Sequence, residues 1–320
     1  MHIIGLNTTD PFFNLAVDEY LLKNSKEEYL VLGINDVCAV VGKHQVSHRE
    51  TDTRFVHEHN IPVIRRISGG GTVFHDNGNL NFSFILNSRE GKQVDFRKYT
   101  KPVIEFLSSA GIPAEFEGRN DLKVGGLKIS GNAEHVFRNR VLHHGTLLFD
   151  SDLNLLKGAL RKDAGKYETR AVASNPSSVT NIKTLLESLT ERPGNIYDFK
   201  SKMADWFGRN YKDSEKGILT DQDNRNIEAL ANSKYRTWEW NYAYGPVYTF
   251  YNTFTFNEQN IRCELTVRNG KISECLIEGN PVLSALSRKL VGEPHMVYDL
   301  KEILRNEGLI DSGFDIFDFF

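Results

Sequence analysis

The stretch Arg65-Arg66-Ile67-Ser68-Gly69-Gly70-Gly71-Thr72-Val73-Phe74-His75-Asp76-Asn77-Gly78-Asn79 decides the interpretation of this 320-residue sequence. Three consecutive glycines between two expected strands carry an entropic penalty on folding. They indicate either a tight strand connection or a backbone that approaches a ligand closely and offers N–H groups to anionic oxygens. The neighbouring arginines and Ser68 favour an anion or a phosphate. The spacing matches neither a GxxxxGK[ST] loop nor a GxGxxG fingerprint.

Alternating helices and strands surround this loop. Ile61–Ile67 predicts a strand before it, and the alternation of Leu80, Phe82, Phe84 and Leu86 with polar residues predicts a half-buried strand after it. Upstream, the sequence predicts a helix from Asp10-Pro11, capped by the aspartate. Two short strands then follow across an Asn35-Asp36 turn, at Tyr29–Gly33 and Val37–Gly42.

The downstream pattern predicts two domains, with a break near residues 235–247. A helix near Lys101–Ala110 ends at Gly111, Ala114–Phe149 is rich in strands, and a further helix contains Ile196, Phe199, Met203 and Trp206. After Gly245-Pro246, Asn269-Gly270 predicts a hairpin within a small α+β domain. Its expected elements are strands Tyr248–Phe256, Ile261–Val267 and Ile272–Ile277 and helices Pro281–Leu290 and Tyr298–Glu307. The expected boundaries are 1–240 and 247–320.

Composition excludes several classes of protein. The net charge is −3, which lacks the basic footprint of a general nucleic-acid-binding protein. No apolar run reaches 18 residues, so we expect no membrane span. The N-terminal residues lack the pattern of a signal peptide, and three unpaired cysteines fit a reducing compartment, so we expect a cytoplasmic protein. A monomer is favoured.

A second informative stretch runs from Gly118-Arg119-Asn120-Asp121 to Lys128-Ile129-Ser130-Gly131 and His143-His144-Gly145-Thr146. A lysine beside a glycine-rich strand is usually an exposed charge, but near a phosphate loop it is a candidate clamp on a phosphate or carbonyl oxygen. Asp121 is a tentative Mg²⁺ ligand, since hard cations prefer oxygen donors. A turn or cap is an equally good interpretation of Asp121.

These motifs resemble the three signatures of the lipoate–protein ligase family: RRISGGGTVFHDNGNLNFSFI, then GRNDLKV with KISGNA, then HHGTLL. Ser177–Ile182 (SSVTNI) resembles the loop that covers the adenylate, and Trp238-Glu239-Trp240-Asn241 resembles the junction to the family's accessory domain. The resemblance runs through nearly the whole chain in the same order. It implies an α/β (α+β) catalytic domain of the biotin/lipoate ligase fold with a mixed sheet, followed by a small α+β C-terminal accessory domain.

The resemblance also implies an activity. Lipoate would react with ATP, with Mg²⁺ assisting, to give lipoyl-AMP. The lipoyl group would then pass to a lysine of a lipoyl domain in 2-oxoacid dehydrogenase complexes or of the glycine-cleavage H protein. Lys128 is the implied catalytic residue. The implied ATP- and lipoyl-adenylate-binding residues are Arg66, Ser68, Gly69, Gly70, Gly71, Thr72, Val73, Phe74, His75, Asn79, Asp121, Lys128, His144 and Asn181. A structural role is the better interpretation of His75 and His143.

One departure from the family pattern leaves an alternative open. Bacterial ligases usually carry arginines just before the VTN element, whereas Ala173–Thr180 contains none and Arg170 is the nearest. A lipoyltransferase that uses preformed lipoyl-AMP or moves acyl groups between proteins is the alternative activity. A cysteine-dependent transferase would need a thiol near the acyl carbonyl, and none of Cys38, Cys263 and Cys275 lies in these motifs. A non-catalytic lipoate-binding protein would not need Lys128.

Overall fold

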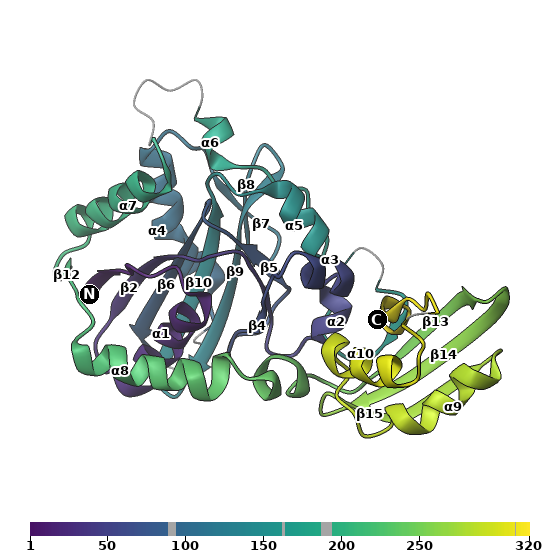
Figure 1. The fold of residues 1–320 in the computed structure, drawn as a ribbon. Helices are drawn as coiled ribbons and strands as arrows, with labels where there is room; N and C mark the ends of the chain where they lie inside the picture. Colours follow the sequence, from purple (N-terminus) through teal and green to yellow (C-terminus); the bar gives the residue numbers. More distant parts are fainter. Residues whose placement is uncertain (89–93, 162–163, 187–193, 311) are drawn as a thin grey trace.

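The computed structural model describes residues 1–88, 94–161, 164–186, 194–310 and 312–320. An eight-stranded sheet forms the larger body of the molecule (Figure 1), and its strand order is β12-β1-β2-β6-β10-β9-β8-β7. β1 pairs in parallel with β2 and β12, and the other pairs are antiparallel, so the predicted mixed sheet is confirmed. The strands are β1 (His2–Gly5), β2 (Tyr29–Ile34), β6 (Asn79–Asn87), β7 (Glu115–Glu117), β8 (Asp121–Val124), β9 (Leu127–Phe137), β10 (Arg140–Leu148) and β12 (Glu215–Lys216).

Helices cover both faces of this sheet. Alternation along β2 directs Leu30 and Leu32 to one face, where they share a core with α4 (Phe96–Ser109) and α7 (Ile196–Asn210). Val31 points to the opposite face and packs with residues of α1 (Pro11–Asn24) and α8 (Asp221–Leu230). α1 begins at the expected Asp10 cap, whose carboxylate accepts the Phe12 N–H.

The glycine-rich loop belongs to a separate three-stranded sheet of β4 (Val63–Arg65), β3 (Cys38–Val41) and β5 (Val73–His75). The two strands expected on either side of Asn35-Asp36 therefore lie in different sheets, because β2 is already paired with β1 and β6. The loop connects β4 to β5, which both pair with β3. Three short helices lie in this region: α2 (Ser47–Glu50), α3 (Thr53–Glu58) and α5 (Leu153–Ala159). A fourth, α6 (Ile182–Leu185), instead packs Ile182 into the core that α4 and α7 share with the main sheet.

The C-terminal part forms its own sheet and core, seen at the lower right of Figure 1. The Asn269-Gly270 hairpin is confirmed, with both residues at positive φ (50° and 71°). The four-stranded sheet has the order β11-β13-β14-β15. Its elements are β11 (Tyr167–Glu168), β13 (Tyr248–Phe256), β14 (Gln259–Arg268), β15 (Lys271–Glu278), α9 (Pro281–Leu290) and α10 (Val297–Asn306). The chain ends in a 3₁₀ turn, η3 (Ile316–Phe319), with Phe319 fully buried.

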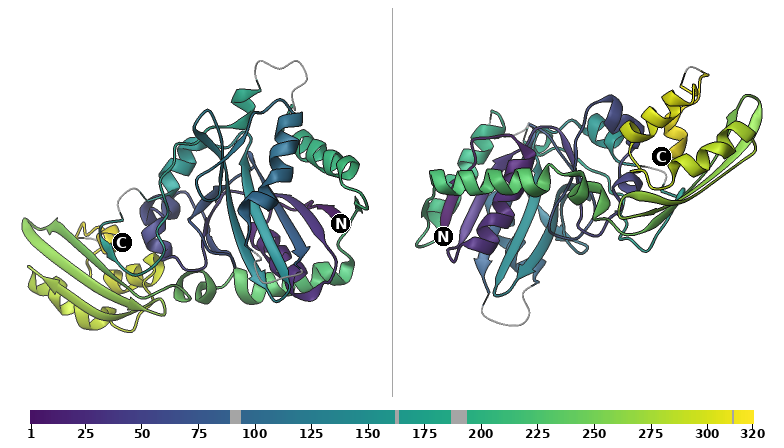
Figure 2. Two further views of the ribbon diagram at one scale, coloured as in Figure 1. Left: turned by 180° about the vertical axis from the view of Figure 1, so that it is seen from behind. Right: turned by 60° about the horizontal axis from the view of Figure 1, so that its bottom comes forward.

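Two features tie this C-terminal sheet to the rest of the molecule. β11 comes from the N-terminal part of the chain, yet it pairs with β13 at Tyr167↔Phe250 and Glu168↔Thr249. A helical connector, comprising α8 and the π-helical segments η1 (Ala231–Tyr235) and η2 (Glu239–Ala243), runs along the lower edge of the molecule toward it (Figures 1 and 2). A domain boundary between residues 240 and 247 remains our proposal.

Arg65 fastens the connector beside the glycine-rich loop. Its side chain is fully buried, and its guanidinium donates hydrogen bonds to the Trp240, Asn241, Gly42 and Gln45 carbonyls at 2.7–3.0 Å. Burial lowers the pKa of Arg65 to about 10, which still leaves the group charged at neutral pH. A buried charge needs such saturation by acceptors. These hydrogen bonds attach the connector to β4.

Two buried histidines, His48 and His295, lie where the C-terminal sheet meets α2. His48 Nε2 donates to the His295 carbonyl at 2.8 Å. His295 Nε2 donates to the Phe319 carbonyl, so the Tyr248 hydroxyl donates to His295 Nδ1 at 2.6 Å. Burial lowers the pKa of His295 to about 4, and burial beside His295 and Arg161 lowers the pKa of His48 well below its usual range.

Because of these two buried histidines, we expect acid to destabilise the folded protein. Because their pKa is lower in the folded state than in the unfolded chain, the unfolded state binds more protons as the pH falls below about 6.5. Above that pH, the two histidines make their full contribution to the free energy of unfolding. Toward pH 4, this free energy should fall by up to about 1.4 kcal/mol per pH unit for each histidine. Urea denaturation midpoints between pH 7.5 and 4.5 measure this, with His295→Gln as the variant expected to flatten the profile. A flat wild-type profile would contradict it.

Within the described ranges, every helix is too short or too polar to cross a bilayer.

Candidate active site

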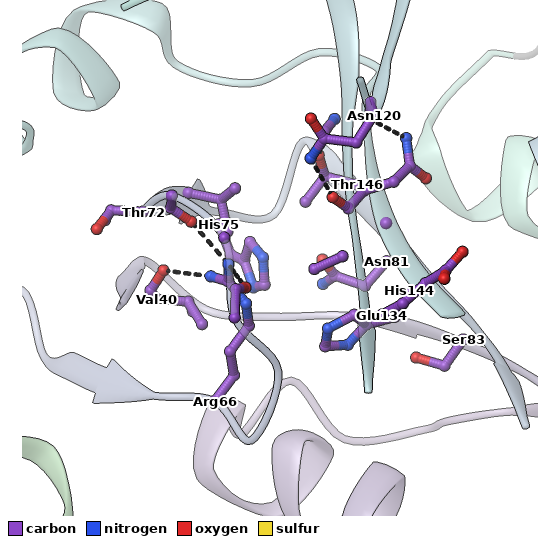
Figure 3. A pocket seen from close by; sticks show the side chains of 18 of the residues that line it. Val40, Arg66, Thr72, His75, Asn81, Ser83, Asn120, Glu134, His144 and Thr146 are labelled. Carbon is purple, nitrogen blue, oxygen red and sulfur yellow. Dashed lines mark hydrogen bonds between the residues drawn. The ribbon is translucent and has the colours of Figure 1, made fainter. Parts of the chain in front are cut away.

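A cavity of about 480 Å³ opens between the main sheet, α1 and the glycine-rich loop (Figure 3). Its volume suits a small-molecule ligand. Apolar side chains contribute to its wall, namely Leu6, Leu15, Val31, Val40, Val73, Phe82, Val94, Phe96 and Ala133. Polar and charged lining groups come from α1, β6, β8, β9, β10 and the glycine-rich loop. The cavity can therefore hold a ligand with an apolar tail and an anionic head.

Arg66 shapes the glycine-rich loop from inside. Its guanidinium donates to the Gly69 and Gly71 carbonyls at 2.6 and 2.7 Å, to the Val40 carbonyl at 3.0 Å and to Ser68 Oγ at 2.9 Å. Turning these carbonyls toward Arg66 allows the loop N–H groups to face the cavity. Gly70 has a φ of 88°, a conformation that favours glycine.

Ser68 starts a hydrogen-bonded chain across the cavity floor. Because Arg66 donates to Ser68 Oγ, the Ser68 hydroxyl is free to donate to His144 Nε2 at 2.6 Å. His144 Nδ1 then donates to Asp18 Oδ2 at 3.0 Å, and that oxygen also accepts the Ser83 hydroxyl. Figure 3 shows His144 and Ser83 across the pocket from Arg66. The chain fixes the His144 ring and links α1 to the glycine-rich loop.

Lys128 projects from β9 into the same cavity. Its Nζ lies 2.8 Å from Asp121 Oδ1 on β8, and both side chains are 22% exposed. A Cβ added at Gly131 would lie 3.2 Å from Lys128 Nζ, so glycine leaves room for the lysine there. The Lys128 backbone donates to the Ser178 carbonyl and accepts the Thr180 N–H, which attaches the 177–182 segment directly to the lysine.

The segment 172–175 covers the glycine-rich loop. Ser174 Oγ accepts the Thr72 N–H at 2.8 Å, accepts from Gln45 Nε2 at 3.1 Å and donates to Glu50 Oε2 at 2.5 Å. The Ser174 hydroxyl oxygen thus accepts a hydrogen bond from a backbone N–H group of the glycine-rich loop, as an anionic oxygen of a ligand could. The contact shows that this side of the loop can bind oxygen atoms.

Comparisons with known proteins agree with this geometry. Residues 10–208 match the family model "Lipoyl protein ligase A/B catalytic domain". The chain is 39% identical to lipoate–protein ligase 1 of Staphylococcus aureus, over 98% of this chain and 94% of that protein. The chain belongs to the lipoyl protein ligase family. The homologues are lipoate–protein ligases, so the protein is an enzyme of this type.

Solved structures of lipoate–protein ligases share the fold. A crystal structure of lipoate–protein ligase A bound with ATP has a TM-score of 0.64 at 24% identity, covering 75% of this chain and 97% of that one. A bipartite lipoate protein ligase from Thermoplasma acidophilum, described with its E2 lipoyl domain, has a TM-score of 0.63 at 25% identity. It covers 75% of this chain and 95% of that one.

Most of the family residues predicted from the sequence line the cavity: Arg66, Gly69, Gly70, Gly71, Thr72, Val73, His75, Asp121, Lys128 and His144. Four predicted residues do not. Ser68 lies behind the wall and bonds His144, and Phe74 is buried in the core under α3 and α5. Asn79 Nδ2 donates to Asn81 Oδ1. The Asn181 side chain bonds the Ser151 backbone.

His75 and His143 are both buried and hydrogen-bonded, and His75 also lines the cavity, so a structural role for them stays a prediction. His75 Nδ1 accepts from Asn35 Nδ2 at 2.9 Å, and burial beside Arg66 and His144 lowers the pKa of His75 to about 3. His143 Nδ1 lies 2.9 Å from Glu134 Oε1, and both side chains are almost fully buried. His75 is therefore neutral at physiological pH.

Sequence reasoning missed several residues of this ligase site. Asp18, Gln45, Glu50 and Ser174 orient the residues above, yet each is a single polar residue far along the chain from the motif it serves. The sequence offered one signal for Asp18, a carboxylate among the apolar positions of the α1 stretch. In the structure this side chain is only 6% exposed. Buried carboxylates are rare unless they are paired.

The cysteines lie outside the cavity. Cys38 and Cys263 are fully buried, and Cys275 is partly buried. Burial raises the pKa of all three thiols, that of Cys275 to about 11. A thiol nucleophile needs a lowered pKa and access to the acyl group, so none of the three fits that role.

We expect the triple variant Cys38→Ala, Cys263→Ala, Cys275→Ala to retain ligase turnover within about threefold of the wild type. Alanine avoids burying a hydroxyl, which would itself be destabilising. Lipoylation of an acceptor domain, followed by mass spectrometry, measures this, with circular dichroism as the control for folding. Loss of all turnover in the folded variant would favour a covalent thiol mechanism.

Proposed function

We propose that this protein joins lipoate to ATP, forming lipoyl-AMP, and then transfers the lipoyl group to a lysine of an acceptor lipoyl domain. The observation that carries the proposal is a single cavity in which Lys128 and the glycine-rich loop meet an apolar wall. A lipoyltransferase that relies on preformed lipoyl-AMP is not favoured, because the relatives are named as ligases.

The first half-reaction uses the charged part of the cavity. A lipoate carboxylate oxygen attacks the α-phosphorus of ATP, a new P–O bond forms, and the bond to the β-phosphate breaks so that pyrophosphate leaves. Negative charge builds up on the α-phosphate oxygens. Lys128 supplies a compact cation there, and the glycine-rich loop supplies N–H donors that need no reorganisation.

The second half-reaction uses the same lysine. The acceptor lysine amine attacks the lipoyl carbonyl carbon, an amide bond forms, and AMP leaves with the electron pair of the broken C–O bond. Lys128 stabilises the oxygen that becomes negative at the carbonyl. Because the adenylate is already an activated acyl group, no covalent intermediate with the protein is required.

The apolar wall suits the acyl chain. Leu15, Val31 and Phe82 are among the apolar residues that line the cavity with Lys128. Burial of each methylene contributes about 0.8 kcal/mol. Among the structural relatives, one was solved with lipoic acid and another with ATP. We infer that lipoate occupies this wall and that ATP occupies the polar part.

Mg²⁺ fits one position in the site. Asp121 lines the cavity and has one carboxylate oxygen, Oδ2, beyond the one paired with Lys128. Mg²⁺ is commonly held by one or two carboxylates together with substrate phosphates. When bound, it would neutralise phosphate charge, and Asp121 would hold it. Within the described part of the chain, no three His, Cys, Asp or Glu residues form a metal site by themselves.

The acceptors are proposed to be lipoyl domains of 2-oxoacid dehydrogenase complexes and the H protein. The Thermoplasma relative was analysed with its E2 lipoyl domain, which supports this class of partner.

The test is the mass of a lipoyl domain after incubation with the enzyme and Mg²⁺. Two donors are compared, lipoate with ATP and synthetic lipoyl-AMP, and pyrophosphate release is followed in parallel. We expect a lipoyl mass shift with both donors and stoichiometric pyrophosphate with ATP. Modification with lipoyl-AMP alone would reject the ATP-dependent step and support the transferase alternative.

A further inference from the structure

The triphosphate of ATP requires cations, and most cationic side chains in the cavity are already engaged. Arg66 directs its donors to three backbone carbonyls and Ser68. Lys128 is paired with Asp121 at the position proposed for the α-phosphate. Neither group is free to hold the β- and γ-phosphates.

Arg119 is the cationic residue of the cavity lining that remains available. It lies in the turn between β7 and β8, its side chain is exposed, and it borders the cavity. Among the described residues, no ion pair or hydrogen bond involves its guanidinium. An exposed arginine at a cavity mouth with five unused donors is suited to bidentate phosphate binding.

The turn that carries Arg119 is held firmly against β9. Asn132 N and Nδ2 both donate to the Asn120 carbonyl at 3.0 Å, and Asn120 Nδ2 donates back to the Asn132 carbonyl. Gly118 adopts a φ of 66°, which favours glycine. Figure 3 shows Asn120 above Thr146 among the residues that line the pocket. Arg119 therefore projects from a fixed base, two residues before Asp121.

The covering segment does not provide a substitute. Residues 172–175 line the cavity but contain no basic side chain, and Arg170 lies outside the lining. Ser174, which contacts the glycine-rich loop, is neutral. A protein cation for the distal phosphates, acting beside the proposed Mg²⁺, must therefore come from another element that borders the cavity.

We propose that Arg119 binds the β- and γ-phosphates of ATP and the pyrophosphate that leaves, and so determines nucleotide affinity in the first half-reaction. The inference rests on the proposed ATP-dependent function. In that step the bond between the α-phosphorus and the bridging oxygen breaks, and pyrophosphate carries the electron pair away beside Arg119. Lipoyl-AMP retains only the α-phosphate, so the second half-reaction does not use this contact.

The test compares Arg119→Gln with Lys123→Gln. Lys123 lies on β8 of the same hairpin, is paired with Glu117 at 2.5 Å and lies outside the cavity lining, so its variant should behave like the wild type. For Arg119→Gln we expect the KM for ATP, measured by pyrophosphate release, to rise by about 10- to 100-fold. Inhibition by added pyrophosphate should weaken in parallel. Transfer from synthetic lipoyl-AMP should change by less than about threefold.

A conservative variant separates charge from geometry. Arg119→Lys retains the charge but loses the planar fork, so its KM for ATP should fall between those of the wild type and Arg119→Gln. A wild-type KM in Arg119→Gln, or equal losses in the two half-reactions, would overturn the role of Arg119. Failure of the proposed function has a different signature: the wild-type enzyme itself would release no pyrophosphate while still using lipoyl-AMP.

Discussion

Lys128→Ala is expected to slow both half-reactions by about 10²- to 10³-fold while leaving the fold intact. In the proposed mechanism the same ammonium faces the α-phosphate in the first step and the lipoyl carbonyl in the second, so its loss should affect turnover with ATP and with lipoyl-AMP alike. KM for the acyl chain should change little, because the apolar wall is untouched. Single-turnover assays with each donor measure the two rates.

The structure provides a matched control for this variant. Lys123 and Lys128 are cross-strand partners on β8 and β9, but Lys123 is paired with Glu117 outside the cavity lining. Lys123→Ala should keep wild-type rates. A double variant, Lys128→Ala with Asp121→Asn, removes the carboxylate left unpaired. Assayed with lipoyl-AMP, for which the proposed Mg²⁺ site is not needed, it tests whether that charge causes the loss. Near-wild-type turnover in Lys128→Ala would show that the assignment of Lys128 is wrong.

How much of this site the sequence could predict depends on how local its signals are. The glycine-rich loop, the Lys128 strand and the His144 strand each carry several informative residues within a short stretch, and all three line one cavity. The Asn269-Gly270 hairpin is equally local and is confirmed. In contrast, Asp18 reaches His144 across 126 residues, and Glu50 reaches Ser174 across 124. Neither pair has a spacing rule that a sequence can reveal.

The differences between the predicted and the observed strand pairing also arise from contacts between residues far apart in the sequence. Tyr29–Gly33 and Val37–Gly42 look like neighbours because a turn joins them, but tertiary pairing with β1 and β6 leaves no free edge on β2. β11 has two residues and no alternation of its own, so its pairing with β13 follows only from the packing of Tyr167 into the C-terminal core. Strand preferences depend strongly on such context.

These long-range contacts link the C-terminal sheet to the cavity. β11 is anchored by β13, and the Thr169 hydroxyl donates to the Val247 carbonyl at 2.8 Å. Three residues later the chain enters the 172–175 segment, whose Ser174 contacts the glycine-rich loop. From the other side, Arg65 bonds the connector at Trp240 and Asn241. We infer that the C-terminal sheet positions the segment that covers the nucleotide.

Removal of residues 246–320 is therefore expected to slow adenylation by about 10²-fold, because misplacing a positioning element by about 1 Å has an effect of that size. Without β13, the 167–175 segment loses its anchor. The glycine-rich loop is then left uncovered when ATP binds. The rate of transfer from synthetic lipoyl-AMP should fall less, because a bulky acceptor domain can reach the adenylate in an open site. Some loss is still expected, since closure of the site protects the adenylate from water.

Folding must be separated from positioning in this experiment. Truncation exposes Val46 and Tyr167, which pack into the C-terminal core, so circular dichroism and size-exclusion chromatography come first. Thr169→Val removes one anchor without truncation and should show a smaller loss of the same kind. In a further arm, residues 246–320 are added as a separate chain and should restore adenylation in part. Equal losses in the two half-reactions, or full adenylation by the truncated protein, would leave the C-terminal sheet with no part in activation.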